Sequence, residues 1–262
     1  MTARRAAATP LAAYLLHRYD WSETSLILDL FTREKGRIAV AAKGAKRPYS
    51  QLRPVLLPFQ KLTVLLARAG ADDAAEVVTL RSADYAGGVP MAGGAALFAG
   101  FYLNELLLRL LARQDAHPAL FDAYEASLPG LTAADDAGVQ SALRAFELTL
   151  LRETGVLPDL ATVTQTAEPL RAAGRYTLHP EAGVVPQPGE EPALGGAALL
   201  AIQAALEHGS LAALQAACRP VLPGLRAPLR SLLQYHLGAV PLRTRQAMVD
   251  VQKLLDLRPS LR

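Results

Sequence analysis

The chain has 262 residues, of which 51% are hydrophobic, so it can bury the core of one large domain or of two ordinary ones. Its apolar runs fall short of the ~20 residues that a membrane span needs, and its N-terminal segment is too short and too weakly apolar for a signal peptide. Its one cysteine excludes an internal disulfide. The net charge of +3 is unevenly spread, because residues 1–68 contain 12 Lys and Arg against 4 Asp and Glu, while residues 69–262 contain 15 against 20. We therefore expect a cytoplasmic protein whose N-terminal part meets a polyanion; a basic face kept for solubility is the alternative.

Residues 1–84 show the alternation of residue types that is typical of β-strands. They predict five short strands, at 14–19, 24–32, 38–42, 58–68 and 76–81. The segment 34–36 predicts a tight turn between the second and third strands, and a long polar connection at 44–54 separates the third from the fourth. Five strands with one long connection favour a small Greek-key barrel of the oligonucleotide-binding type, the OB-fold.

Beyond a glycine-rich connection at 87–90, apolar residues recur at helical spacing. The predicted fold is therefore α+β, with an OB-fold barrel at 1–84 and a mainly α-helical domain at 85–262. Within the second domain, 156–193 is rich in Pro, Gly and Thr and is expected to be a loop with one hairpin, formed by 176–178 and 184–185. Helices are predicted at 97–111, at 117–128, from a cap at Asp135 or Asp136 to Gly155, and at 194–207, 211–217, 225–237 and 244–255.

Residue patterns that support catalysis are missing from the sequence. The segment 43–45 reads Lys-Gly-Ala, the reverse of a phosphate-binding loop, the five histidines include no pair at metal-ligand spacing, and there is no Gly-x-Ser-x-Gly elbow. The acidic pairs at 72–73 and 135–136 are interpreted as turn and capping residues rather than a nuclease site. We expect no enzymatic activity, cofactor or metal, and we expect Cys218 to be a small buried residue of a helix.

Cationic side chains gather on the second to fourth predicted strands and their connections. Tyr49 follows Lys46 and Arg47 in the long connection, and an aromatic ring among phosphate contacts is the combination that single-strand binders use; burial of this ring against the barrel is an equal alternative. Arg37 and Lys43 share the outer face of the third strand and are expected to act together. The candidate DNA-binding residues are Arg33, Lys35, Arg37, Lys43, Lys46, Arg47, Tyr49, Arg53 and Lys61.

Several strings of this sequence resemble those of a known family. They read Trp-Ser-Glu-Thr-Ser-Leu at 21–26, Val-Ala-Ala-Lys-Gly-Ala at 40–45, Leu-Pro-Phe at 57–59, Gly-Phe-Tyr-Leu-Asn-Glu-Leu at 100–106 and Leu-Arg-Ala-Phe-Glu-Leu at 143–148. In order and spacing they look like the bacterial recombination and repair family RecO, over about residues 11–155. After residue 155 the likeness is weak.

The resemblance implies a non-enzymatic mediator of DNA repair and homologous recombination that is associated with the nucleoid. Proteins of that family bind single- and double-stranded DNA, anneal complementary strands and, with RecR, help to load RecA on DNA coated by single-stranded DNA-binding protein. Their basic contacts map here to Arg37, Lys43, Lys46 and Arg47. An RNA-binding or structural adaptor without annealing activity is the alternative, and a metal-dependent nuclease is a third hypothesis.

The resemblance also implies a second binding surface, in the helical domain. The family captures the acidic, apolar C-terminal tail of single-stranded DNA-binding protein, and the matching arginine is Arg144, flanked by Leu143 and Phe146. A guanidinium beside an apolar groove suits a peptide that ends in a hydrophobic residue and a carboxylate; an exposed Arg144 paired with Glu147 is the alternative. Several family members hold a four-cysteine zinc site after this helix, but 160–183 contains no cysteine here, so we expect no zinc.

Overall fold

A computed structural model describes residues 9–67, 77–90, 93–133, 135–189 and 192–248. These residues fall into two compact units. The first consists of the described residues of Met1–Met91 together with Leu106–Phe121, and the second of those of Ala92–Glu105 and Asp122–Arg262. Most of the helix expected at 244–255 lies outside the described residues.

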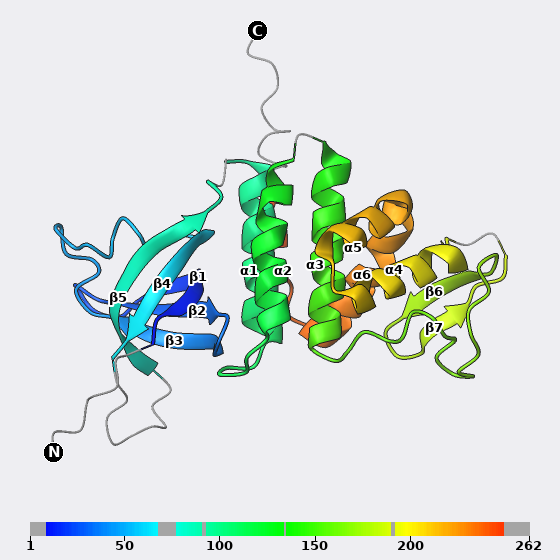
Figure 1. The fold of residues 1–262 in the computed structure, drawn as a ribbon, viewed down its shortest axis with the longest axis horizontal. Helices are drawn as coiled ribbons and strands as arrows, with labels where there is room; N and C mark the ends of the chain where they lie inside the picture. Colours follow the sequence, from blue (N-terminus) through cyan, green and yellow to red (C-terminus); the bar gives the residue numbers. More distant parts are fainter. Residues whose placement is uncertain (1–8, 68–76, 91–92, 134, 190–191, 249–262) are drawn as a thin grey trace, which may run out of the picture. The chain divides into compact units, whose positions relative to one another are not determined.

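Five strands of the first unit form a closed barrel in the order β1-β2-β3-β5-β4, drawn from blue to cyan in Figure 1. Neighbouring strands are antiparallel except β3 and β5, which are parallel. The five predicted strands and the α+β class are therefore confirmed. The strands are β1 (Leu11–Asp20), β2 (Leu26–Thr32), β3 (Gly36–Ala42), β4 (Gln60–Leu66) and β5 (Val77–Gly88).

Alternate residues of the strands fill the interior of the barrel. Leu28, Leu30, Val40, Leu62 and Val64 are completely buried there. Because successive side chains of a strand point to opposite faces, the same alternation that predicts the strands also selects these residues for the core. Full burial of each such side chain contributes about 1.5–3 kcal/mol.

The outer face of β1, β2 and β3 is covered as well, by the segment Leu106–Phe121. The ring of Phe121 packs against the rings of Tyr14 and Phe31, with both centroid distances at 5.4 Å. The amide of Gln114 donates a hydrogen bond to the carbonyl of Arg37 (2.9 Å), so the covering segment also continues the hydrogen bonding at the edge of β3. Burial on both faces explains why β2 and β3 consist almost entirely of buried residues.

Gly36 begins β3 with a φ of +64° and lies directly against the covering segment. A Cβ at this position would come within 1.7 Å of the carbonyl oxygen of Asp115. We expect Gly36→Ala to lower the free energy of unfolding by about 3 kcal/mol, from backbone strain and the clash together, as measured by denaturant titration. Gly155→Ala is the matched control, because Gly155 has a φ of +73° but no atom within 4 Å of its Cβ. An equal loss in both variants would mean that the contact with Asp115 contributes nothing.

The second unit is mainly helical, as predicted, and α1 and α2 contribute residues to both units. Asp135 is the N-cap of α3: its carboxylate accepts a hydrogen bond from the amide of Gly138 (2.7 Å), which confirms the predicted cap. None of the described helices is long and apolar enough to cross a bilayer. The helices are α1 (Ala95–Leu110), α2 (Pro118–Ser127), α3 (Asp136–Glu153), α4 (Gly196–His208), α5 (Leu211–Cys218) and α6 (Leu222–Leu237), with 3₁₀ turns η1 (Leu128–Thr132) and η2 (Arg219–Val221).

The Pro- and Gly-rich segment contains the single hairpin that the sequence predicts. Its strands are β6 (Arg175–His179) and β7 (Gly183–Pro186), and β8 (Leu194–Gly195) pairs with the other edge of β6, which packs against α6 (Figure 1). The hydroxyl of Thr164 accepts a hydrogen bond from the amide of Val184 (2.8 Å), and that of Tyr176 accepts one from the amide of Arg171 (2.9 Å). Within the described residues, no group of His, Cys, Asp and Glu could hold a metal ion. Backbone pairing, these hydrogen bonds and apolar packing stabilise the segment.

β5 is longer than the sequence predicts. It includes Gly87 and Gly88, which the sequence assigns to the connection between domains. A Cβ at Gly88 would lie 2.8 Å from the carbonyl oxygen of Phe59, so the close approach of β4 requires glycine there rather than a loop. The predicted boundary at residue 84 falls inside this strand, and the division of the chain into domains 1–84 and 85–262 stays a prediction.

Candidate nucleic-acid interface

The connection between β3 and β4, residues 43–59, is called the basic loop here. Apolar residues anchor it to the barrel: Ala45 and Leu56 are buried in the barrel core, and Leu52 and Val55 pack against that core. The sequence shows this segment as a long polar connection, but its apolar residues close one end of the barrel. The loop is therefore fixed to the barrel at several points along its length.

Consecutive tight turns order the basic loop between its anchors. The amide of Arg47 donates to the carbonyl of Gly44 (3.1 Å), that of Ser50 to Arg47 (3.0 Å) and that of Arg53 to Ser50 (3.3 Å). Each of these hydrogen bonds joins residues three apart and closes a β-turn, so the loop is a series of turns and not an extended chain. Such ordering lowers the conformational entropy that the loop would lose on binding a ligand.

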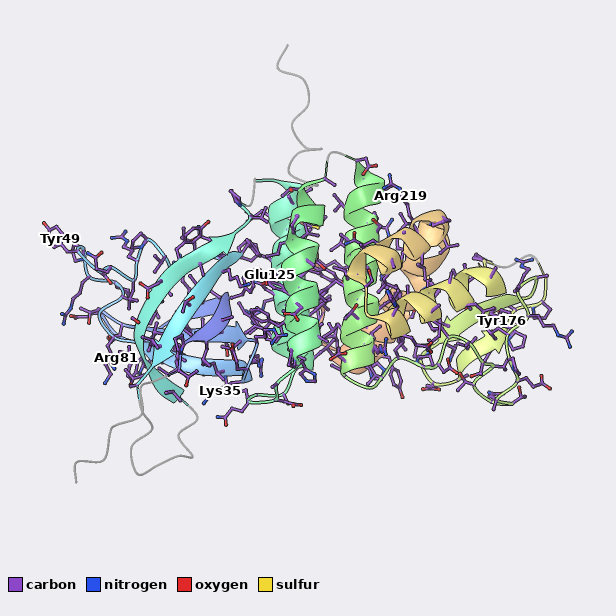
Figure 2. The ribbon with its side chains drawn as sticks, in the orientation of Figure 1. Lys35, Tyr49, Arg81, Glu125, Tyr176 and Arg219 are labelled. Carbon is purple, nitrogen blue, oxygen red and sulfur yellow. The ribbon has the colours of Figure 1, made fainter. Side chains whose placement is uncertain are left out.

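The charged side chains of the basic loop lie in solvent. Lys43, Arg47 and Arg53 are exposed. Tyr49 is 96% exposed, and Figure 2 shows it at the outer end of the loop. The alternative in which Tyr49 packs against the barrel is therefore wrong. Three cations and one aromatic ring face the solvent from one ordered segment.

Lys46 differs from its neighbours because it connects the basic loop to the turn between β1 and β2. Its Nζ lies 3.0 Å from a carboxylate oxygen of Asp20 and donates to the carbonyl of Ser22 (3.0 Å), while its amide donates to the carbonyl of Thr24 (2.9 Å). An ion pair this accessible is worth at most about 1 kcal/mol, so a phosphate could replace Asp20 at the ammonium group.

The other predicted cations lie at the opposite end of the β2–β3 hairpin. Arg33 and Lys35 are exposed in its turn, and Lys61 pairs across the sheet with Tyr14, in the part of the barrel near that turn. Figure 2 shows Lys35 well separated from Tyr49. The sequence predicts one surface for all these residues, whereas the structure places them at two ends of the barrel.

Arg37 is a structural residue in this arrangement. Its guanidinium donates to the carbonyl of Leu108, and its Nε is buried. Leu108 lies in the last turn of α1, where carbonyl groups have no partner within the helix, so a cation there satisfies an acceptor and complements the helix dipole. Lys43 directly follows the last residue of β3 and lies six positions after Arg37, about 20 Å at roughly 3.3 Å per residue. Joint action of these two cations on one ligand stays a prediction, and Arg37 already donates to the carbonyl of Leu108.

Sequence reasoning missed Arg81, an exposed cation of β5 labelled in Figure 2. Leu80 and Ser82 pair with consecutive residues of β4, so Arg81 forms a bulge and opposes no residue of that strand. In the parallel pair, Ala41 opposes Thr79. Arg81 lies two residues beyond Thr79, as Lys43 lies two beyond Ala41, so both cations belong to the basic-loop end of the barrel. A bulge interrupts the period of two, and the alternation could not reveal it.

In the second unit, Arg144 is buried and paired. Its Nη1 lies 2.7 Å from one carboxylate oxygen of Glu147, and the other oxygen accepts a hydrogen bond from the hydroxyl of Tyr102 (2.7 Å). Arg144 is 9% exposed and Glu147 is completely buried. The alternative, an exposed Arg144 paired with Glu147, is therefore half right: the pair is confirmed, but the predicted exposure of Arg144 is wrong.

Leu143 and Phe146 are core residues. Phe146 is completely buried and packs edge-on against Tyr124, with a centroid distance of 6.1 Å, and Leu143 is also buried. α3 contacts α5, α6 and η1, so it is buried on more than one side. In this conformation Phe146 offers no surface to a peptide, and Arg144 exposes only an edge. Direct contact between a peptide and all three predicted residues is not compatible with this packing.

We expect the buried Glu147 carboxyl to make the free energy of unfolding depend on pH. Burial raises its pKa above the usual 4.5, although Arg144 and the Tyr102 hydroxyl oppose the shift. The folded chain therefore holds this proton at higher pH than the unfolded chain does. The stabilising contribution of this group is fully present below the usual pKa and declines as the pH rises through the raised folded value. We expect the difference in unfolding free energy between the wild type and Glu147→Gln to change across that window, and a constant difference would contradict the shift.

Cys218 ends α5 as a buried residue, as predicted. Burial raises the pKa of its thiol to about 12. The reactive thiolate is therefore scarce at neutral pH, and a nucleophilic role has no support.

Comparison with known proteins covers both units. The family described as "Recombination protein O N terminal" matches residues 9–83, and the family described as "Recombination protein O C terminal" matches residues 92–246. Three proteins named "DNA repair protein RecO" are similar over most of their length. That of Acidovorax ebreus (strain TPSY) is 50% identical over 97% of this chain and 100% of its own, that of Verminephrobacter eiseniae (strain EF01-2) is 50% identical over 96% and 99%, and that of Variovorax paradoxus (strain S110) is 53% identical over 92% and 96%. On this evidence the chain belongs to the RecO family of DNA repair proteins.

Proposed function

We propose that this chain is a non-enzymatic recombination mediator that binds single- and double-stranded DNA through the basic loop and anneals complementary strands at the nucleoid. The observation that carries the proposal is the outward placement of Lys43, Arg47 and Arg53 around Tyr49, on a loop anchored in the barrel core. Membership of a DNA repair family supports a DNA ligand over another polyanion.

Electrostatic screening is the physical basis of the proposed annealing. Two DNA strands repel each other through their phosphates, and cations that replace condensed counterions lower this repulsion without reading the sequence. An aromatic ring beside the cations stacks on a base and keeps the base edge available for pairing. Neither step forms a covalent bond or needs ATP.

Family membership also supports the proposed partners RecR and single-stranded DNA-binding protein and, through them, RecA. For the C-terminal tail of single-stranded DNA-binding protein we keep Arg144 as the proposed cationic centre, with Leu143 and Phe146 as the buried residues that support it. Replacing Arg144 alone would leave Glu147 buried without its cation. Combining Tyr102→Phe, Arg144→Met and Glu147→Leu removes both charges and the hydroxyl that Glu147 accepts from, and this variant should lose tail-peptide binding while it retains binding to naked DNA.

Strand annealing on coated DNA tests the proposal. Complementary single strands are coated with the cognate single-stranded DNA-binding protein, and duplex formation is followed with the full chain, once with the intact coating protein and once with a tail-less form. We expect the chain to accelerate annealing, and to do so less when the tail is missing. No acceleration in either case would refute the mediator function, and tighter binding to structured RNA than to single-stranded DNA would favour the adaptor.

A further inference from the structure

Aromatic side chains line the end of β1 and the turn that follows it. His17 is exposed, Tyr19 is 46% exposed and Trp21 is 55% exposed. The rings of His17 and Tyr19 are in edge-to-face contact, with centroids 4.5 Å apart. These three residues are called the aromatic strip here. Exposed rings in contact with each other, followed two residues later by an exposed Trp, are uncommon on a surface that contacts only water.

Neighbouring groups hold the aromatic strip in place. The ring of Tyr19 contacts that of His17, which opposes Asp29 across β1 and β2, and an oxygen of Asp29 lies 3.8 Å from the guanidinium of Arg113. The amide of Trp21 donates to the carbonyl of Ser25 (3.3 Å), which closes the turn. The rings are therefore presented from backbone and side chains that are already ordered, so a ligand would lose little by ordering them.

The turn that holds Trp21 is joined directly to the basic loop. Lys46 joins them through its contacts with Asp20, Ser22 and Thr24. A further hydrogen bond runs from the amide of Gly44 to the hydroxyl of Ser25 (3.3 Å). Trp21 belongs to the turn that Lys46 contacts, and it therefore joins the strip to the cations of the loop.

From this juxtaposition we propose that His17, Tyr19 and Trp21 form a base-stacking surface for single-stranded DNA whose phosphates lie on the basic loop. The inference rests on the proposed DNA binding and names the part of the ligand that the rings contact. The adjoining cations favour a polyanion over an apolar protein segment as the occupant. Bases of a duplex already stack on each other, so an intact duplex can use the cations but not the rings.

Trp21 is the only tryptophan of the chain, so its fluorescence reports directly on this surface. The full-length wild-type protein is titrated with oligothymidine, with an abasic strand of the same length and with a duplex of equal charge. Oligothymidine should quench the emission, and the abasic strand and the duplex should leave it nearly unchanged although they bind. Equal quenching by all three would overturn the inference, because phosphates alone would then explain the signal.

Variants test the same point through affinity, measured by anisotropy of labelled DNA. Trp21→Ala should weaken binding of oligothymidine about tenfold and change binding of the abasic strand and the duplex less than twofold. Trp21→Phe retains a ring and should recover most of the loss. Tyr85→Ala is the matched control, since Tyr85 is 58% exposed on β5 of the same barrel. An equal loss in the Tyr85 variant, or an equal loss on abasic DNA, would contradict stacking at the strip.

These outcomes separate the inference from the function on which it rests. Salt-dependent DNA binding with no change in Trp21 emission would refute the stacking surface but not DNA binding by the basic loop. If none of the DNAs bound, both the stacking surface and the proposed DNA-binding function would be refuted.

Discussion

Replacing Lys43, Arg47 and Arg53 together with alanine is expected to weaken DNA binding roughly 10- to 100-fold at moderate salt. These cations are exposed on a loop that is fixed to the barrel, so their loss removes phosphate contacts without disturbing the core. The slope of log affinity against log salt should become shallower by about 2 on single strands, at roughly 0.7 per lost contact. Titration of labelled DNA at several salt concentrations measures both quantities.

The matched control removes the same charge from the second unit. Arg171, Arg226 and Arg230 are also exposed, and their replacement by alanine lowers the net charge equally. If DNA contacts are concentrated on the basic loop, this control keeps most of its affinity and its salt slope. Equal losses in both triple variants would indicate a diffuse effect of net charge and would remove the physical basis of the proposed interface.

The largest effect on stability is expected from Glu147→Ala. Its carboxylate is completely buried between the guanidinium of Arg144 and the hydroxyl of Tyr102. Without it, a cation and a hydroxyl stay buried with no partner, and breaking a buried pair in this way costs about 3–5 kcal/mol. Denaturant unfolding should show the loss as a lower midpoint at an unchanged slope.

Two comparisons keep this prediction specific. Glu207 is an exposed glutamate of α4, and Glu207→Ala should change the unfolding free energy by less than about 0.5 kcal/mol. Combining Tyr102→Phe, Arg144→Met and Glu147→Leu removes every polar partner at once and should recover most of the stability. A triple variant as unstable as Glu147→Ala would mean that lost packing, rather than unpaired polar groups, accounts for the effect.

Local patterns predict the barrel and the helices because those patterns follow directly from burial. Alternation along β2 and β3 and the cap at Asp135 depend on neighbours in sequence, and both are present in the structure. The exposure of Tyr49 could not be decided in that way. It depends on Ala45 and Leu56, which occupy the end of the barrel and leave the ring in solvent.

Other features depend on contacts between distant parts of the chain. Arg37 has the same charge as Lys43, but Leu108 lies beside it and accepts its hydrogen bond. The resemblance predicts a binding role for Arg144 but carries no information on its burial. In the structure Arg144 is buried and paired with Glu147, which also accepts a hydrogen bond from Tyr102. Charge and spacing identify candidate residues, whereas the tertiary neighbour decides which of them can meet a ligand.

The covering segment Leu106–Phe121 has a practical consequence for dissecting the protein. A single cut near residue 90 would release strands whose outer aromatic face, with Tyr14 and Phe31, had lost Phe121. An N-terminal fragment that ends before residue 106 lacks the covering segment. One that extends to residue 121 also contains residues 92–105, which belong to the other unit. A self-sufficient barrel would have to splice the strands to 106–121 through a short artificial linker, and simple truncation should instead yield material prone to aggregation.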